Sequence, residues 1–185
     1  MSPTRQKINP TFIFIAGLIV IFCAQDLYAG ELGARYREAI RCVKLKQPDF
    51  AFMGFRSIAR DFPDNPLAER AIFAMAEYYY DNKMYYDAIK NFTLCAKDCS
   101  DFKANVIAKA YILKIIKEIE DPSLEEKEMF EDIKKEFFSK SLILIFSEYK
   151  KTSYRSASLN KFKIRHQADN VDVYRNDQPF LTLEP

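Results

Sequence analysis

The sequence predicts a mainly α-helical protein, in which α-helical hairpins form a superhelix and a short β-hairpin follows at the C-terminal end. From Glu69 to about Ser100 the chain carries two apolar stripes at helical spacing, with a short polar break between them. The tail instead alternates apolar and polar residues, which is typical of strands. The 185 residues include only 4 glycines, too few for a sheet-rich fold with many tight turns.

The first 29 residues have the layout of a secretory signal peptide. Arg5 and Lys7 precede an apolar stretch over 12–24, and Ala29 supplies a small residue at the expected cut. This stretch is shorter than the roughly 20 apolar residues that a membrane-spanning helix needs. We therefore expect a protein secreted across the inner membrane into the periplasm. An uncleaved leader that anchors the chain is the alternative.

Residues 30–150 are predicted to form the helical domain, and 151–185 a polar linker with the β-hairpin. The first helix is expected over Glu31–Lys46, and Pro48 suits the first turn of a second helix. The Phe-Pro-Asp-Asn-Pro stretch over 62–66 should end that second helix, because neither proline can continue it. Aligning Ala51 with Ala88 gives an offset of 37 residues between successive hairpins.

The central hairpin carries the clearest pattern. Its apolar positions at helical spacing are Ile72, Met75, Ala76 and Tyr79 on one helix, and Tyr85, Ala88, Ile89, Phe92 and Cys95 on the next. Small Ala76 and Ala88 stand where the two helices would approach closely, with bulky aromatic residues around them. The break between the helices is Asp81-Asn82-Lys83.

A third unit repeats this order at Ala104, Ile107, Ala108 and Tyr111, and its first helix continues to about Ile119. Ser123 and Glu126 form a capping-box pattern for a last helix, expected from about Leu124 to Tyr149. That helix would contain an apolar run over 142–146 that needs cover on every side. The expected covering residues are Ile115, Ile116 and Ile119 of the preceding helix and Val171, Val173, Phe180 and Leu181 of the tail.

The order of small and aromatic residues over 32–115, with the prolines of 62–66, resembles the tetratricopeptide (TPR) repeat. It is similar to TPR proteins of the bacterial cell envelope, including the repeat regions of outer-membrane assembly lipoproteins and of Tol-Pal coordinator proteins. Lys83 stands where the family commonly has glycine, and no lipid-anchored cysteine is evident. The resemblance implies an α-solenoid with a partner-binding groove. Its groove positions correspond to Tyr36, Ile40, Arg70, Phe73, Glu77, Tyr80, Asn105 and Lys109.

Candidates for chemistry are few. The single histidine, His166, has no cysteine or acidic cluster at ligand spacing, and the carboxylates over 125–132 alternate with lysines as on a solvated helix face. A net charge of +2 provides no basic patch for nucleic acid. Cys95 is expected to be a buried thiol, whereas Cys99 is a better candidate for a disulfide. We expect no enzymatic activity, no cofactor and no metal.

Two hypotheses of function follow. In the first, the protein is a scaffold or adaptor of the envelope that binds a segment of a partner protein in the TPR groove. In the second, it is a structural or assembly subunit of an envelope or secretion complex, and residues 161–183 add strands to a partner's sheet. Contact with a membrane is expected only through an uncleaved leader.

Overall fold

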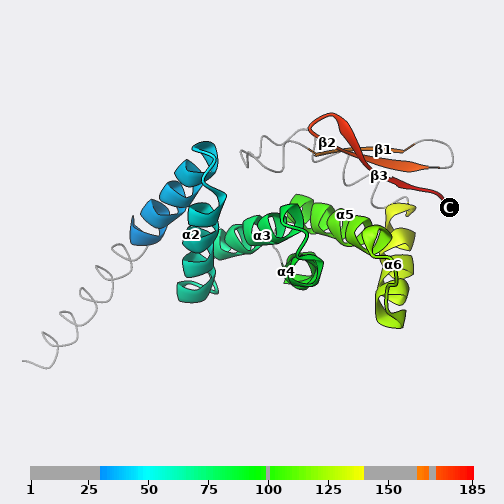
Figure 1. Ribbon diagram of the computed structural model, residues 1–185, viewed down its shortest axis with the longest axis horizontal. Helices are drawn as coiled ribbons and strands as arrows, with labels where there is room; N and C mark the ends of the chain where they lie inside the picture. Colours follow the sequence, from blue (N-terminus) through cyan, green and yellow to red (C-terminus); the bar gives the residue numbers. More distant parts are fainter. Residues whose placement is uncertain (1–29, 99–100, 140–161, 167–169) are drawn as a thin grey trace, which may run out of the picture. The chain divides into compact units, whose positions relative to one another are not determined.

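The computed structural model describes residues 30–98, 101–139, 162–166 and 170–185, which are mainly helical and end in a small antiparallel sheet (Figure 1). The chain divides into two units, Met1–Gly54 and Phe55–Pro185, and each is described by itself. Within the described ranges, no helix is both long enough and apolar enough to cross a membrane.

The first unit is built from a helix over 30–44 and the first half of α2 (Pro48–Asp61). The two helices approach closely at Gly54, where an added Cβ would lie only 3.1 Å from the Cβ of Ala39. Lys46 turns the chain between them in the left-handed region, with φ 56°. Its N–H bonds to the carbonyl of Val43, and the N–H of Gln47 bonds to that of Cys42. This pair of bonds is a Schellman motif, which satisfies carbonyls at the helix end.

The second unit repeats this turn between α3 (Pro66–Asp81) and α4 (Tyr85–Asp98). Lys83 has φ 59°, its N–H bonds to the carbonyl of Tyr80, and the N–H of Met84 bonds to that of Tyr79. Lys46 and Lys83 are 37 residues apart, which equals the offset predicted from the apolar pattern. Asn65 caps the start of α3 by accepting a hydrogen bond from the N–H of Leu67 at 2.9 Å.

The next helices are α5 (Phe102–Glu118) and α6 (Leu124–Phe137). The predicted capping box at Ser123 and Glu126 is confirmed in both directions. The predicted extension of this helix to Tyr149 is wrong, because α6 ends at Phe137. The N–H of Ser139 bonds to the carbonyl of Glu136, three residues back, and this tight turn closes the helix. The apolar run over 142–146 lies outside the described residues.

The tail forms short strands, as its alternation predicts, and these make a sheet of three strands that includes the predicted hairpin. Strands β1 (Phe162–His166), β2 (Val171–Arg175) and β3 (Gln178–Leu183) form an antiparallel sheet with β2 in the middle. Asn176 and Asp177, with φ 54° and 61°, form the two-residue turn between β2 and β3. Pairing shifts from Val173↔Leu181 to Tyr174↔Pro179, so Phe180 is an extra residue in β3. This bulge lets the consecutive residues Phe180 and Leu181 both be buried.

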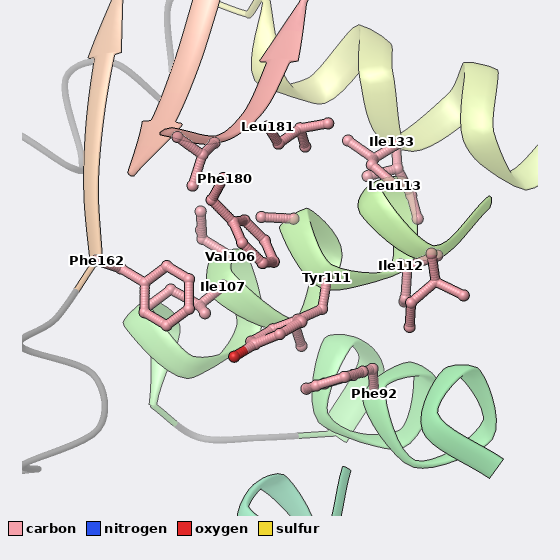
Figure 2. Packing of buried hydrophobic residues seen from close by; sticks show 14 of the residues in the cluster. Phe92, Val106, Ile107, Tyr111, Ile112, Leu113, Ile133, Phe162, Phe180 and Leu181 are labelled. Carbon is pink, nitrogen blue, oxygen red and sulfur yellow. The ribbon is translucent and has the colours of Figure 1, made fainter. Parts of the chain in front are cut away.

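The core of the second unit is centred on α5, which packs between α4 and the sheet (Figure 2). Tyr111 is fully buried, and its ring stacks on that of Phe92 in α4 with centroids 4.3 Å apart. On its other side it meets Phe162 and Phe180 of the sheet edge-on, at 5.5 and 5.0 Å. The sheet is therefore part of the same core as the helices.

Candidate functional site

The helix faces predicted to line a groove are covered, over α3 and α5, by the chain's own sheet. Tyr80 of α3 contacts Phe180 with ring centroids 6.0 Å apart, and it contacts Tyr111 of α5 at 5.1 Å. Beyond the rings, the ammonium of Lys117 on α5 donates to the carbonyl oxygen of Thr182 on β3 at 2.8 Å. A partner segment could lie along these faces only after displacing the sheet.

A polar cluster joins the sheet to α3 beside the aromatic residues. The hydroxyl of Tyr111 donates to Oε1 of Glu77 at 2.8 Å. The guanidinium of Arg175 bonds to Oδ1 of Asp81 at 3.1 Å and lies 3.9 Å from Oε1 of Glu77. Its Cζ also lies 5.6 Å from the centroid of the Tyr111 ring. Arg175 therefore connects β2 with two carboxylates of α3 and with the central aromatic residue of α5.

The electrostatics of this cluster favour a neutral Tyr111 hydroxyl and a charged Arg175 guanidinium. Burial first, and then the neighbouring Glu77 carboxylate, raise the pKa of the Tyr111 hydroxyl well above its usual value. The neighbouring Tyr111, Asp81 and Glu77 outweigh burial and raise the pKa of Arg175 further. The neutral Tyr111 phenol donates a hydrogen bond to the Glu77 carboxylate, and the Arg175 cation balances the charge of that carboxylate. These interactions stabilise the contact between the sheet and the helices.

Most of the predicted groove residues have partners within the chain. Phe73 is only 4% exposed and packs edge-on against Phe92 at 5.6 Å, so it is a core residue and not a lining residue. Asn105 donates from Nδ2 to the carbonyl of Ala96 and thereby ties α5 to the last turn of α4. Lys109 pairs with Glu136 of α6 at 2.6 Å. Phe73, Glu77, Tyr80, Asn105 and Lys109 thus all connect elements of the second unit.

The other three predicted groove residues are Arg70, Tyr36 and Ile40. Arg70 is exposed on α3. Tyr36 and Ile40 are half-buried on the helix over 30–44 of the first unit. Sequence reasoning placed Tyr111 on the apolar face of its helix, which its burial confirms, but it missed Arg175. No local pattern marks an arginine in a strand as the partner of Glu77 and Asp81, almost a hundred residues earlier.

The sheet has two edge strands, β1 and β3, and neither has a second strand beside it among the described residues. In the order β1-β2-β3, β2 is paired on both sides, and β3 lies against α5. β1 pairs with β2 only, so its second row of backbone N–H and C=O groups faces away from the sheet. Lys163 and Arg165, which alternate with Phe162 and Ile164, are exposed along this strand. The free edge, defined as β1 with these two basic side chains, therefore presents backbone groups that no other described strand pairs with.

The other candidates for chemistry are placed as core or surface residues. Nε2 of His166 is buried without a hydrogen-bond partner among the described groups, and burial lowers the pKa of this imidazole. Across the described ranges, no three cysteine, histidine or acidic residues gather as metal ligands. Cys95 is buried in the core, as expected, and Cys42 is half-buried. Cys99 lies outside the described residues.

Comparisons with models of known protein families, with curated proteins and with solved structures give no match to this chain.

Proposed function

We propose that the protein is a non-catalytic protein-binding scaffold of TPR-like helical hairpins, and that it binds its partner through the C-terminal sheet. The Schellman turns at Lys46 and Lys83, 37 residues apart, support a repeated helical hairpin. The observation that carries the proposal is the position of the sheet. Its inner face covers the faces of α3 and α5 that would otherwise bind a partner, and β1 pairs with β2 alone among the described residues.

The seating of the sheet favours this mode over binding in the groove. Phe162, Phe180, Leu181 and Leu183 are each less than a tenth exposed in the shared core. Fully burying one large apolar side chain contributes roughly 1.5–3 kcal/mol, so displacing four would cost about as much as the net stability of a domain. The helices therefore act as a rigid base that presents the free edge.

Site-specific photo-cross-linking separates the two modes of binding. A photoreactive phenylalanine analogue would replace Arg165 at the free edge, Tyr36 at the predicted groove, or Tyr86 as an exposed control on α4. We expect partner adducts in intact cells from position 165 and none from 36 or 86. Adducts from position 36 alone would show that the partner binds in the groove.

The proposed location is the bacterial periplasm, which the leader pattern over 1–29 supports. That segment lies outside the described residues. N-terminal sequencing of protein from a periplasmic fraction should begin at Gly30. A sequence that begins at Met1 in the membrane fraction would instead establish the anchored alternative.

A further inference from the structure

We infer that the free edge selects an extended partner segment in which acidic residues alternate with apolar ones. This inference rests on the proposed function and specifies the chemistry of its partner.

The geometry of β1 sets the alternation of the partner. Phe162 is buried, Ile164 and His166 are half-buried, and Lys163 and Arg165 are exposed. The side chains of an added strand alternate in the same way, so every second residue would stand beside Lys163 and Arg165 on the outer face. The residues between them would continue the apolar inner face beside Phe162 and Ile164. A partner segment must therefore be apolar at every second position.

The charge of the outer face decides what the other positions carry. Lys163 makes an ion pair with Asp177 in the β2–β3 turn, yet its side chain is still 53% exposed. The guanidinium of Arg165 lies over the Tyr174 ring at 5.0 Å, and Arg165 stands opposite Asp172 on β2, so each basic residue already faces one carboxylate within the sheet and has the edge of β1 on its other side. Opposite charges directly across two strands are stabilising, and like charges are destabilising. Glutamate or aspartate opposite these two residues is therefore favoured.

The same two residues exclude a second copy of β1 as the occupant. If two copies paired antiparallel about Ile164 with their sheets facing the same way, Lys163 would lie opposite Arg165 in both directions. Pairing about Lys163 or about Arg165 would place that residue opposite itself. Each of these registers brings like charges together at an edge, which natural sheets use to prevent self-association. The like charges therefore disfavour pairing of β1 with a second copy of itself and leave an acidic strand as the favoured partner.

A peptide experiment on the full-length mature protein tests the inference. The probe is a short labelled peptide in which glutamate alternates with valine. One control has the same composition with its glutamates in one block, and another has lysine in place of glutamate. Binding is measured by fluorescence anisotropy, and position is measured by hydrogen exchange of the β1 amides. We expect the alternating glutamate peptide to slow that exchange and to bind roughly tenfold more tightly than the lysine peptide.

Charge-swapped variants make the test specific to β1. Lys163→Glu with Arg165→Glu should reverse the preference, so that the lysine peptide binds better. The matched control is Lys90→Glu with Lys127→Glu, which makes the same change in net charge on exposed helix positions and should leave the preference unchanged. Melting temperatures of both double variants establish that the sheet is retained.

Three results would overturn the inference. Equal binding of the blocked peptide would show non-specific attraction, and failure of every peptide to protect β1 would show that no acidic strand adds there. A dimer in sedimentation that the β1 double variant abolishes would show that the occupant is a second copy. Continued cross-linking from position 165 in these cases would leave the proposed scaffold function standing. Loss of cross-linking from position 165 would contradict both this inference and the proposed scaffold function.

Discussion

Tyr111 shows how one residue couples the helices to the sheet. Its ring contacts α3, α4 and both outer strands, and its hydroxyl donates to Glu77. We expect Tyr111→Phe, which removes only the hydroxyl, to lower the free energy of unfolding by about 1 kcal/mol. Tyr111→Ala also leaves a cavity and should cost about 3–5 kcal/mol. Urea unfolding measures both, with Tyr86→Ala, 80% exposed, as a neutral control. Equal costs for the two changes at Tyr111 would contradict this packing.

The tyrosines of the interface predict a loss of stability at high pH. Burial first, and then the Glu118 carboxylate, raise the pKa of Tyr80 from 10.0 to about 12. Because the folded state holds this proton more tightly, its contribution is complete below about pH 10 and is lost as the pH rises to about 12. The pKa of the Tyr111 hydroxyl is also raised, chiefly by burial.

We expect Tyr80→Phe to flatten the decline in the free energy of unfolding across this pH range, and Tyr86→Phe to leave it unchanged. Denaturant unfolding at a series of alkaline pH values provides the measurement. An identical decline in Tyr80→Phe and the unaltered chain would mean that the Tyr80 hydroxyl titrates normally in the folded protein.

At the scale of elements, the backbone conformation of Lys83 lowers the stability of the turn, and a substitution could relieve this strain. Lys83 occupies the left-handed region with φ 59°, where a Cβ is unfavourable by roughly 1–2 kcal/mol. Lys83→Gly should raise the free energy of unfolding by about 0.5–1 kcal/mol, after allowing for the greater freedom of glycine in the unfolded chain. The matched control Lys90→Gly, inside α4, should instead lower it by about 1 kcal/mol. A loss of stability from Lys83→Gly would show that the lysine side chain itself contributes at the turn.

The elements also show what the sequence could predict. Helical periodicity with caps located the helices over 30–98 and the start of α6, because these signals are local. The end of α6 at Phe137 was missed, since the apolar pattern resumes at Leu142 and no glycine or proline between 138 and 149 marks a stop. The bulge at Phe180 could likewise not be predicted from the sequence, because it depends on how β3 pairs with β2.

The candidate site was less predictable than the fold for the same reason. The groove residues were inferred as if the helices stood alone, but the sheet that covers Glu77 and Tyr80 comes from the far end of the chain. Contacts such as Arg175 with Asp81 depend on tertiary packing and leave no periodic signal. Only the alternation in β1 hinted at a strand that could pair with another chain.

At the scale of the whole molecule, the sheet and the helices of the second unit should unfold as one. Six sheet residues (Phe162, Val171, Val173, Phe180, Leu181 and Leu183) belong to the same buried cluster as α4, α5 and α6. Two-state unfolding is expected when one core joins all elements. Hydrogen exchange of amides in β2 and in α5 should therefore report the same free energy of opening.

Truncation after Lys150 gives the sharpest form of this prediction. The shortened chain would lose all three strands and with them the cover over Tyr111, Ile107 and Leu113, which are now fully buried. Such a large apolar surface favours self-association. The truncated protein should therefore bind a hydrophobic dye, sediment as oligomers and melt without a cooperative transition. As the matched comparison, Arg175→Gln keeps the strands and removes only the charge that pairs with Asp81 and Glu77, so it should remain monomeric and lose about 1–3 kcal/mol. A truncated chain that stays monomeric, does not bind the dye and melts cooperatively would show that the helices fold without the sheet. The groove over α3 and α5 would then again be open to a partner.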